Sequence, residues 1–364
     1  MKKVGILNFQ YSTHNYGAVL QAAALEYICR QLGHKAAHLD YMAKPRVTFI
    51  RQLSQLKNRV ARMLRILGLR DTPMANQAAN EEAFERFRKT FINRTERIKS
   101  VQDFRRIVQG FDAAIVGSDQ VWRPAMAKDV IAFFLGYVPK GVDRISYAAS
   151  FGTETWEHGD DAILTEKVRQ ELQQFKAISC REQSGVEICR NVFGIEAIHV
   201  LDPLLLVDNS FFDWVLSHSS VKPGAKLVYY KLDTAPAFHK DLKTISSEFG
   251  DALNIYSLSN TVRHYREVPD WLALIAGSEV VVTDSFHCIC LGLRFGKEVI
   301  YCPNERTGRT RLDSLFKQLD IENEPLGIKV ETSMFNLRRS DNIASLLEEK
   351  SYCSLDFIKN ALSG

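Results

Sequence analysis

Short apolar runs alternate with segments of helical periodicity through residues 226–319, and this pattern constrains the fold more than any other feature. Each run is rich in β-branched residues, and the segments between the runs carry apolar residues three and four positions apart. Such alternation predicts a parallel sheet that helices cover on both faces. The expected strands are 226–232, 252–258, 279–284 and 298–303, and the expected helices are 237–249, 270–277, 287–295 and 310–319.

The first half of the chain carries a second set of such runs. Strands are expected at 3–8, 35–41, 111–119, 143–152, 177–182 and 196–203, with a helix at 18–32 that Gly33 caps and a polar, exposed helix at 81–91. A length of 364 residues fits two domains. We therefore predict an α/β protein in which two Rossmann-like domains, 1–205 and 206–340, face each other across a cleft. A helical tail at 341–364 is expected to pack back across their junction.

Composition and absent motifs exclude several classes of protein. No apolar run is long enough for a transmembrane helix, and polar residues interrupt the N-terminal run before a signal-peptide core can form. The seven cysteines form no CxxC pair, which favours buried reduced thiols over a zinc site. The chain also lacks GxGxxG after its first strand, GxxxxGK[ST], GxSxG and HExxH. We expect a cytoplasmic protein that requires neither a metal nor a redox cofactor.

The segment 44–70 is strongly basic. It holds eight Lys and Arg residues and no Asp or Glu, whereas the whole chain has a net charge of only +4. Apolar residues recur within it at helical spacing, which predicts a basic amphipathic helix. Such a helix either packs its apolar stripe on its own domain, or lies on an anionic membrane face or grips a lipid diphosphate. Nucleic-acid binding is disfavoured because no recognition motif accompanies the charge.

Polar side chains gather where expected strands end and helices begin. Ligands of open parallel sheets bind at that edge, and a helix N-terminus offers free N–H groups to an anion. His287 stands out because it lies in the first turn after a buried strand. The other candidates are Asn15, Tyr16, Gly17, Asp119, Gln120, Trp122, Arg181, Asp284, Ser285, Arg309 and Arg311. Each of them also has a simpler interpretation as a helix cap, a core residue or part of a solvated loop.

Six stretches taken together resemble the polysaccharide pyruvyl transferase family. They are NYGAVLQAAAL at 15–25, VGSDQVW at 116–122, ISYAASFG at 145–152, ISCRE at 178–182, VLDP at 200–203 and VVVTDSFHCICLGLRFGK at 280–297. The similarity follows the family's order over nearly the whole chain. It implies a fold like that of the GT-B glycosyltransferases, with 1–205 on the acceptor side and 206–340 on the donor side.

The resemblance also implies a reaction. Phosphoenolpyruvate would be the donor and a sugar the acceptor, with the pyruvyl group joined to two sugar hydroxyls as a ketal. By motif, the family's essential histidine falls on His287 and its donor-binding arginine on Arg181. Some members carry an arginine where this chain has Ser285, so Arg309 or Arg311 is expected to supply that charge.

Ketal formation needs a proton donor and a proton acceptor, and histidine serves as both near neutral pH. We assign this role to His287, with Asp284 or Asp119 as its partner. The donor-binding residues are then Arg181, Ser285, Arg309 and Arg311. The acceptor-binding residues are Asn15, Tyr16, Gly17, Asp119, Gln120 and Trp122, and the ring of Tyr16 or Trp122 is expected to lie against a sugar face.

The expected acceptor is a sugar on a lipid diphosphate carrier or a polysaccharide repeat unit. This acceptor would account for the basic segment 44–70 without a membrane span, and it would place the protein at the inner face of the membrane. Two alternatives stay open: a GT-B glycosyltransferase that uses a nucleotide sugar, and a non-catalytic sugar-binding protein of the same fold. A nucleotide would protect the first against thermal unfolding, whereas the second would tolerate the loss of His287.

Overall fold

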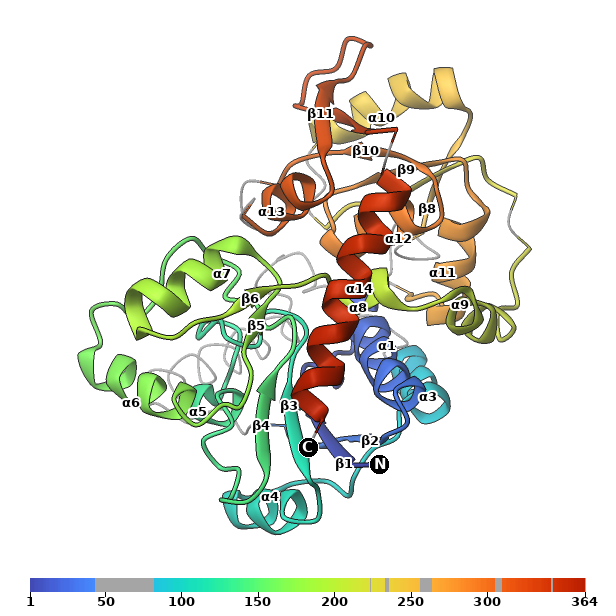
Figure 1. Ribbon diagram of the computed structural model, residues 1–364. Helices are drawn as coiled ribbons and strands as arrows, with labels where there is room; N and C mark the ends of the chain where they lie inside the picture. The colour runs from blue at the N-terminus through green and yellow to red at the C-terminus, as the bar shows by residue number, and fades with distance from the viewer. Residues whose placement is uncertain are drawn as a thin grey trace, which may run out of the picture.

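The computed structural model describes residues 1–42, 82–222, 224–232, 236–255, 264–304, 310–341 and 343–363. Its elements form two α/β halves, each built on its own sheet, and the long final helix lies across both (Figure 1). The basic helix expected at 44–70 and the side chain of Arg309 lie outside the described residues. Their roles therefore stay predictions.

The first sheet has four parallel strands in the order β2-β1-β3-β4. They are β1 (Lys3–Leu7), β2 (Lys35–His38), β3 (Ala113–Val116) and β4 (Asp143–Ser146). The central strands β1 and β3 are buried at almost every position, which is why both read as continuous apolar runs. Helix α1 (Tyr16–Gln31) follows β1 and ends just before Gly33, whose φ of +83° suits the glycine that the sequence placed there.

Past β4 the parallel order continues through two very short strands, β5 (Ser179–Cys180) and β6 (Ile198–His199). Backbone bridges tie Ala149 to Cys180 and Ile145 to Ala177. The other helices of this half are α3 (Glu82–Phe91), α4 (Val101–Val108), α5 (Val130–Phe133), α6 (Ala162–Leu172) and α7 (Gln183–Ile188), which runs into a π-helical turn at Cys189–Phe193. Because β5 and β6 end early, the polar residues that follow them lie outside the sheet, at its carboxyl edge.

The second sheet has six strands in the order β11-β12-β10-β9-β7-β8. Its parallel part consists of β7 (Leu227–Tyr230), β8 (Ala252–Asn254), β9 (Val280–Thr283) and β10 (Glu298–Tyr301), all of which the sequence predicts. Helices α10 (Pro236–Phe249), α11 (Val268–Gly277), α12 (Phe286–Arg294) and α13 (Thr310–Gln318) also match the prediction. The antiparallel edge pair β11 (Ile321–Pro325) and β12 (Phe335–Arg339) was not expected.

The predicted helical tail is a single helix, α14 (Ile343–Leu362), and it crosses the junction as expected (Figure 1). It packs on the short helix α8 (Pro203–Leu206), which in turn packs on α1 and α12. The Ser354 hydroxyl accepts a hydrogen bond from the Leu201 N–H at 3.0 Å. Neither α14 nor any other helix within the described ranges is long and apolar enough to cross a membrane.

Aromatic side chains from both halves meet at the junction. Tyr16 of α1 stacks on Trp271 of α11, with ring centroids 4.7 Å apart and planes 3° apart, and its hydroxyl donates to the Arg266 carbonyl. Helix α3 adds Phe84 to this cluster and buries two further phenylalanines. The expectation that α3 is exposed is therefore wrong, because only one face of this helix is polar. One apolar core runs through both halves.

The domain limits at 205 and 340 stay a prediction. The strands of the first sheet come from residues 3–146 and those of the second from 227–339. Between them lie α8 and α9 (Asn209–Leu216). Because α8 contacts α1, α12 and α14, it belongs to the junction as much as to either half.

Candidate active site

Two helix N-termini from different halves meet at His287. Helix α12 starts directly after β9 and carries His287 in its first turn, while α1 starts after β1 with Gly17 in its first turn. A Cβ placed on Gly17 would lie 2.2 Å from Nδ1 of His287. Gly17 therefore lets the backbone of α1 approach the imidazole ring, where the sequence had suggested an approach to a ligand.

The imidazole has two polar neighbours at Nε2. Nη1 of Arg181 lies 3.1 Å from it and Oδ2 of Asp202 lies 3.6 Å from it. Neither partner is the one expected, since the sequence suggested Asp284 or Asp119. The His287 side chain is only 5% exposed.

Arg181 sits at the centre of a buried ionic cluster. Its Nη1 donates to Oδ2 of Asp202 at 2.9 Å and its Nη2 donates to Oδ1 of Asp119 at 3.3 Å. Burial alone would lower the pKa of this guanidinium, but the three carboxylates around it hold the pKa above its ordinary value. With 1% of its side chain exposed, Arg181 is not placed to clamp a donor directly. Its partners occupy both terminal nitrogens.

Asp202 is the site residue that sequence reasoning missed. It caps α8 by accepting the Leu204 N–H at 3.1 Å, and it also accepts the Ser118 hydroxyl at 2.9 Å. Burial alone would raise its pKa, but the nearby His287 and Arg181 hold it well below the usual range. The available signal was Asp followed by Pro at a strand end, because proline favours the first position of a helix that aspartate caps.

Asp119 and Gln120 follow β3 at the same edge of the first sheet. Asp119 has a φ of +81°, and its carboxylate accepts the Gln120 N–H at 2.8 Å besides bonding Arg181. Although burial raises the pKa of Asp119, the charges of Arg181, His287 and Arg311 bring it below its ordinary value. The side-chain oxygen of Gln120 accepts from Arg123 at 3.1 Å.

The second half contributes a further guanidinium. The guanidinium carbons of Arg181 and Arg311 lie 4.4 and 5.9 Å from the ring centre of Phe286, the neighbour of His287. Burial and the charge of Arg181 lower the pKa of Arg311 to about 10. The structure thus brings together Arg181, Arg311 and His287, as the sequence suggested. Ser285 takes the N-cap position of α12, but its side chain makes no capping hydrogen bond to a described residue.

Asp284 is engaged away from His287. Its carboxylate accepts the Lys231 ammonium at 2.9 Å, the Leu232 N–H at 2.9 Å and the Asn304 amide at 3.0 Å. The predicted Asp284–His287 partnership is therefore corrected. Asp284 instead ties together the ends of three strands of the second sheet.

Three expected acceptor-binding residues have structural roles. Asn15 caps α1 by accepting the Ala18 N–H at 3.1 Å. The rings of Tyr16 and Trp122 have no exposed surface, since Tyr16 stacks on Trp271 and Trp122 stacks on Phe134. Neither ring lies where it could face a sugar, because each is packed inside an apolar cluster.

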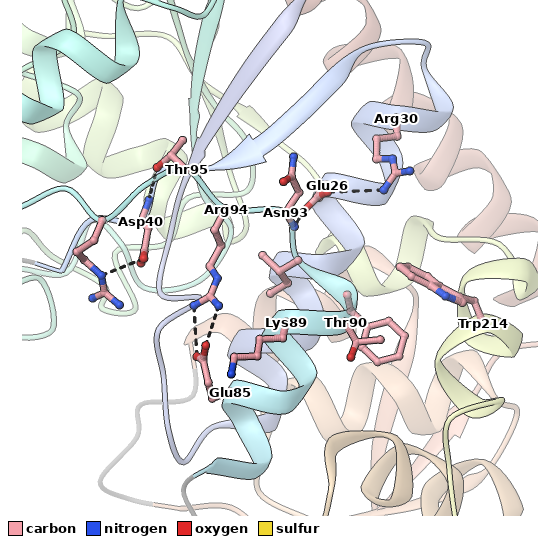
Figure 2. A pocket seen from close by; sticks show the side chains of 13 residues that line it. Glu26, Arg30, Asp40, Glu85, Lys89, Thr90, Asn93, Arg94, Thr95 and Trp214 are labelled. Carbon is pink, nitrogen blue, oxygen red and sulfur yellow. Dashed lines mark hydrogen bonds and ion pairs between the residues drawn. The ribbon is translucent and has the colours of Figure 1, made fainter.

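A polar cavity of about 710 Å³ lies elsewhere in the first half, between α1, α3, the stretch 92–97 and Trp214 of α9 (Figure 2). Among its charged side chains, Arg94 is paired with Glu85 at 2.7 Å and Arg97 with Asp40 at 2.9 Å. Buried Glu26 lines it and lies 3.6 Å from Nε2 of His38. Burial raises the pKa of Glu26 to about 7 and lowers that of His38 to about 3. No predicted site residue lines this cavity.

Metal ligands do not gather in the described part of the chain. No group of three or more His, Cys, Asp or Glu side chains there is arranged to hold a metal ion. The six cysteines at positions 29, 180, 189, 288, 290 and 302 are buried and reduced.

Several solved structures resemble this protein at low sequence identity. A protein of Listeria monocytogenes assigned as a UDP-N-acetylglucosamine 2-epimerase matches with a TM-score of 0.50 and 10% identity, over 100% of this chain and 91% of that one. A UDP-GlcNAc 2-epimerase of Neisseria meningitidis bound to UDP-GlcNAc gives a TM-score of 0.44 at 10% identity, covering 88% and 91% of the two chains. The E. coli heptosyltransferase WaaC with ADP gives 0.38 at 11% identity, covering 87% and 98%. The first match supports the predicted fold of two Rossmann-like domains in a GT-B-like arrangement.

Sequence comparison identifies the family. No curated protein matches the chain. The family model described as polysaccharide pyruvyl transferase matches residues 15–306, which include His287, Arg181 and Asp202. This range covers most of the chain and spans both sheets. The protein belongs to the polysaccharide pyruvyl transferase family.

Proposed function

We propose that the protein transfers the pyruvyl group of phosphoenolpyruvate to a sugar of a polysaccharide or lipid-linked repeat unit and forms a pyruvate ketal. The coarser activity, pyruvyl transfer to polysaccharide, is that of its family. The observation that carries the proposal is the position of His287, which lies with Arg181 and Arg311 around Phe286. This cluster stands where the carboxyl ends of strands from both sheets meet.

The charge of the cluster suits the donor. Phosphoenolpyruvate carries a phosphate and a carboxylate, so its site needs positive charge within reach. Burial and the neighbouring charge of Arg181 lower the pKa of Arg311 to about 10, so an anion bound beside it would favour its charged form. An anion beside Arg311 would offset both the lost hydration and the repulsion between the guanidiniums. Arg311 is therefore the proposed donor contact, and the enclosed Arg181 supports the site through its charge.

His287 would move the protons of the reaction. Protonation of the donor's methylene carbon leaves positive charge on the adjacent carbon, which a sugar hydroxyl attacks. Phosphate leaves, and a second hydroxyl closes the ketal ring. The two hydroxyls lose two protons, of which one replaces the proton given to carbon and the other leaves with the phosphate. A single imidazole can serve both transfers, because its neutral form accepts a proton and its charged form returns one.

The proposed acceptor is a sugar attached to a lipid diphosphate or to a polysaccharide repeat unit. The family name supports a polysaccharide, and the eight basic residues of the segment 44–70 support an anionic lipid carrier. Each Lys or Arg beside an anionic surface contributes about 1 kcal/mol to binding. A lipid-linked acceptor should therefore depend on this segment, whereas a short water-soluble acceptor should not.

The test is incubation of the full chain with phosphoenolpyruvate and a panel of lipid-linked and soluble sugar acceptors. Phosphate release and the mass of the acceptor are followed together, with His287→Gln protein as the control. We expect phosphate and pyruvylated sugar in equal amounts from the unmodified protein alone. Phosphate release without a gain in acceptor mass would contradict the proposal, as would pyruvylation by the His287→Gln protein.

A nucleotide-sugar reaction is the alternative to exclude. At the end of β9 the Lys231 ammonium is paired with the buried Asp284 carboxylate, so this lysine is not available to hold a diphosphate at α12. We expect phosphoenolpyruvate to raise the midpoint of thermal unfolding and UDP to leave it unchanged. The opposite pattern would favour a glycosyltransferase.

A further inference from the structure

The Asp202 carboxylate holds together the buried ionic cluster around Arg181. Its side chain has no exposed surface, and its carboxylate takes hydrogen bonds from the Ser118 hydroxyl, Nη1 of Arg181 and the Leu204 N–H. The helix that it caps, α8, packs on elements of both halves. Asp202 is thus fixed on several sides before any substrate binds, and Nε2 of His287 lies 3.6 Å from its Oδ2.

The hydrogen bonds define which nitrogen of His287 carries the proton. A guanidinium has donors and no acceptor, so the 3.1 Å contact between Nη1 of Arg181 and Nε2 is a hydrogen bond only if Nε2 accepts. A neutral imidazole then carries its proton on Nδ1, on the side of Gly17. Because Arg181 is fixed by Asp202, the carboxylate sets this tautomer through the arginine.

The protonated ring needs a different partner. Once Nε2 carries a proton it can no longer accept from Arg181, and it needs an acceptor of its own. Oδ2 of Asp202 is the carboxylate oxygen next to it, and a small tilt of the ring would close the 3.6 Å gap. The same oxygen can therefore serve both states of the histidine.

We propose that Asp202 is the positioning residue of His287. It fixes the neutral tautomer through Arg181, and it accepts a hydrogen bond from the Nε2–H of the charged ring. Nδ1, above Gly17, is then the nitrogen that exchanges protons with substrate. This inference rests on the proposed function of the same site. It assigns Asp202 no contact with substrate.

Four charged groups face the imidazole from the elements packed around it. Arg181 lies after β5, Asp119 after β3, Asp202 at the start of α8 and Arg311 on α13, whereas α1 presents only the backbone of Gly17. With Asp202 ionised, the two guanidiniums lie among three carboxylates, those of Asp119, Asp202 and Glu182. Neutralising Asp202 leaves the imidazole in a more positive surrounding.

The test is the substitution Asp202→Asn. Asparagine is as good a helix cap as aspartate, so α8 should form and the chain should fold. We expect kcat to fall about 10- to 1,000-fold while KM for phosphoenolpyruvate changes less than about 3-fold, because the residue acts on the histidine and not on the donor. The pH–rate profile should change as well, because the substitution removes a negative charge beside the histidine.

Asp241→Asn is the matched control. Asp241 is buried, with 2% of its surface exposed, and it lies on α10 away from the cluster. Its carboxylate accepts the Thr332 hydroxyl and the backbone N–H groups of Glu331 and Thr332, and these bonds lower its pKa against the effect of burial. Its substitution should lower stability and leave kcat and the pH profile unchanged. A loss of kcat in both variants would mean that the Asp202 effect is general destabilisation, and the proposal would fail.

A readout that needs no turnover separates this inference from the proposed function. In protein labelled with ¹⁵N-histidine, the His287 resonances, identified by their loss in His287→Gln, should show a protonated Nδ1 and an unprotonated Nε2. Asp202→Asn should mix the tautomers. A proton on Nε2 in the unmodified protein, or unchanged resonances in Asp202→Asn, would overturn the inference even if ketal formation were established. Absence of pyruvyl transfer with the expected resonances would instead reject the function.

Discussion

Two histidines of this protein lie at the same distance from a buried carboxylate, in opposite electrical settings. Nε2 of His287 is 3.6 Å from Asp202, and Nε2 of His38 is 3.6 Å from Glu26. The pKa of Asp202 lies well below its usual range, whereas burial raises that of Glu26 to about 7. Distance between the two groups therefore does not decide the charge of such a pair.

The difference comes from the cations around each carboxylate. Asp202 has a fully buried guanidinium in hydrogen-bond contact at 2.9 Å, while the cation nearest to Glu26, Arg30, is 3.8 Å away and largely exposed. Glu26 receives one backbone N–H, from Asn93. Desolvation then dominates, and both groups of the Glu26–His38 pair are uncharged between about pH 3 and pH 7. The carboxylate of the first pair is held ionised by its arginine, whereas the second pair lies uncharged beneath a polar cavity.

Substitution of Arg181 should have the largest effect, because it removes the cation that distinguishes Asp202 from Glu26. Arg181→Gln leaves Asp119 and Asp202 buried without their cation, and it should lower the free energy of unfolding by about 3–5 kcal/mol. Without the arginine the carboxylates should resemble Glu26, with raised pKa values, so part of the stability should return as the pH falls. Urea unfolding at about pH 5 and pH 8 measures both effects. A loss below about 1 kcal/mol would show that the cluster does not depend on Arg181.

A pair of histidine substitutions tests whether turnover depends on His287 and not on His38. His287→Gln should reduce turnover about 10²–10⁴-fold, the usual contribution of general acid–base catalysis. His38→Gln should leave kcat unchanged and lower the free energy of unfolding by about 1–3 kcal/mol, because His38 is fully buried. Steady-state rates and unfolding curves of both proteins provide the measurement. Equal losses of kcat would remove the distinction between the two histidines.

The pH dependence of stability should sharpen the comparison at Glu26. Its pKa is raised from 4.5 to about 7 in the folded chain, so its protonated form stabilises the fold fully below about pH 4.5, and this stabilisation is lost as the pH rises through 7. Glu26→Gln has no such loss. Relative to the unmodified protein, the variant should gain about 3 kcal/mol of unfolding free energy between about pH 4 and pH 8. A constant difference across this range would show that Glu26 ionises normally.

The smallest expected effect concerns α1, the helix that carries both Gly17 and Glu26. In Gly17→Ala the new Cβ would lie within 2.5 Å of two ring atoms and the Cβ of His287, so the ring must shift. We expect a destabilisation of about 1–3 kcal/mol, typical of overpacking, with a fall in kcat. Gly327→Ala, where a Cβ meets nothing within 4 Å, is the control. Normal turnover in Gly17→Ala would mean that the placement of the ring over α1 is unimportant.

The sequence predicts the strands and the gathering of His287, Arg181 and Arg311, because both follow from local rules. Apolar runs mark strands, and strand ends in parallel sheets share one edge. The hairpin β11–β12 escapes these rules, since its strand Ile321–Pro325 is mostly exposed and carries polar residues.

The partners of the site residues are harder to predict than their location. Asp202 and His287 are 85 positions apart and meet only because α8 and α12 pack together. Asp284 is three residues from His287 but turns to Lys231 instead. Tyr16 and Trp122 are of the aromatic type that can stack on a sugar ring. Only the packed structure shows that other aromatic rings cover them. Side-chain direction and burial arise from tertiary packing, which residue type alone does not encode.

The position of α14 sets an order of events during synthesis. This helix is made after the strands of both sheets, yet it lies on the first half. There Phe357 meets Tyr147 with ring centroids 6.3 Å apart, and the Lys176 ammonium donates to the Ser363 carbonyl. Domains usually fold in the order in which they leave the ribosome. Here the N-terminal half must wait, with its junction surface uncovered, until the C-terminal half has been translated. A nascent chain stalled before residue 343 should accordingly be more dependent on chaperones than the released protein.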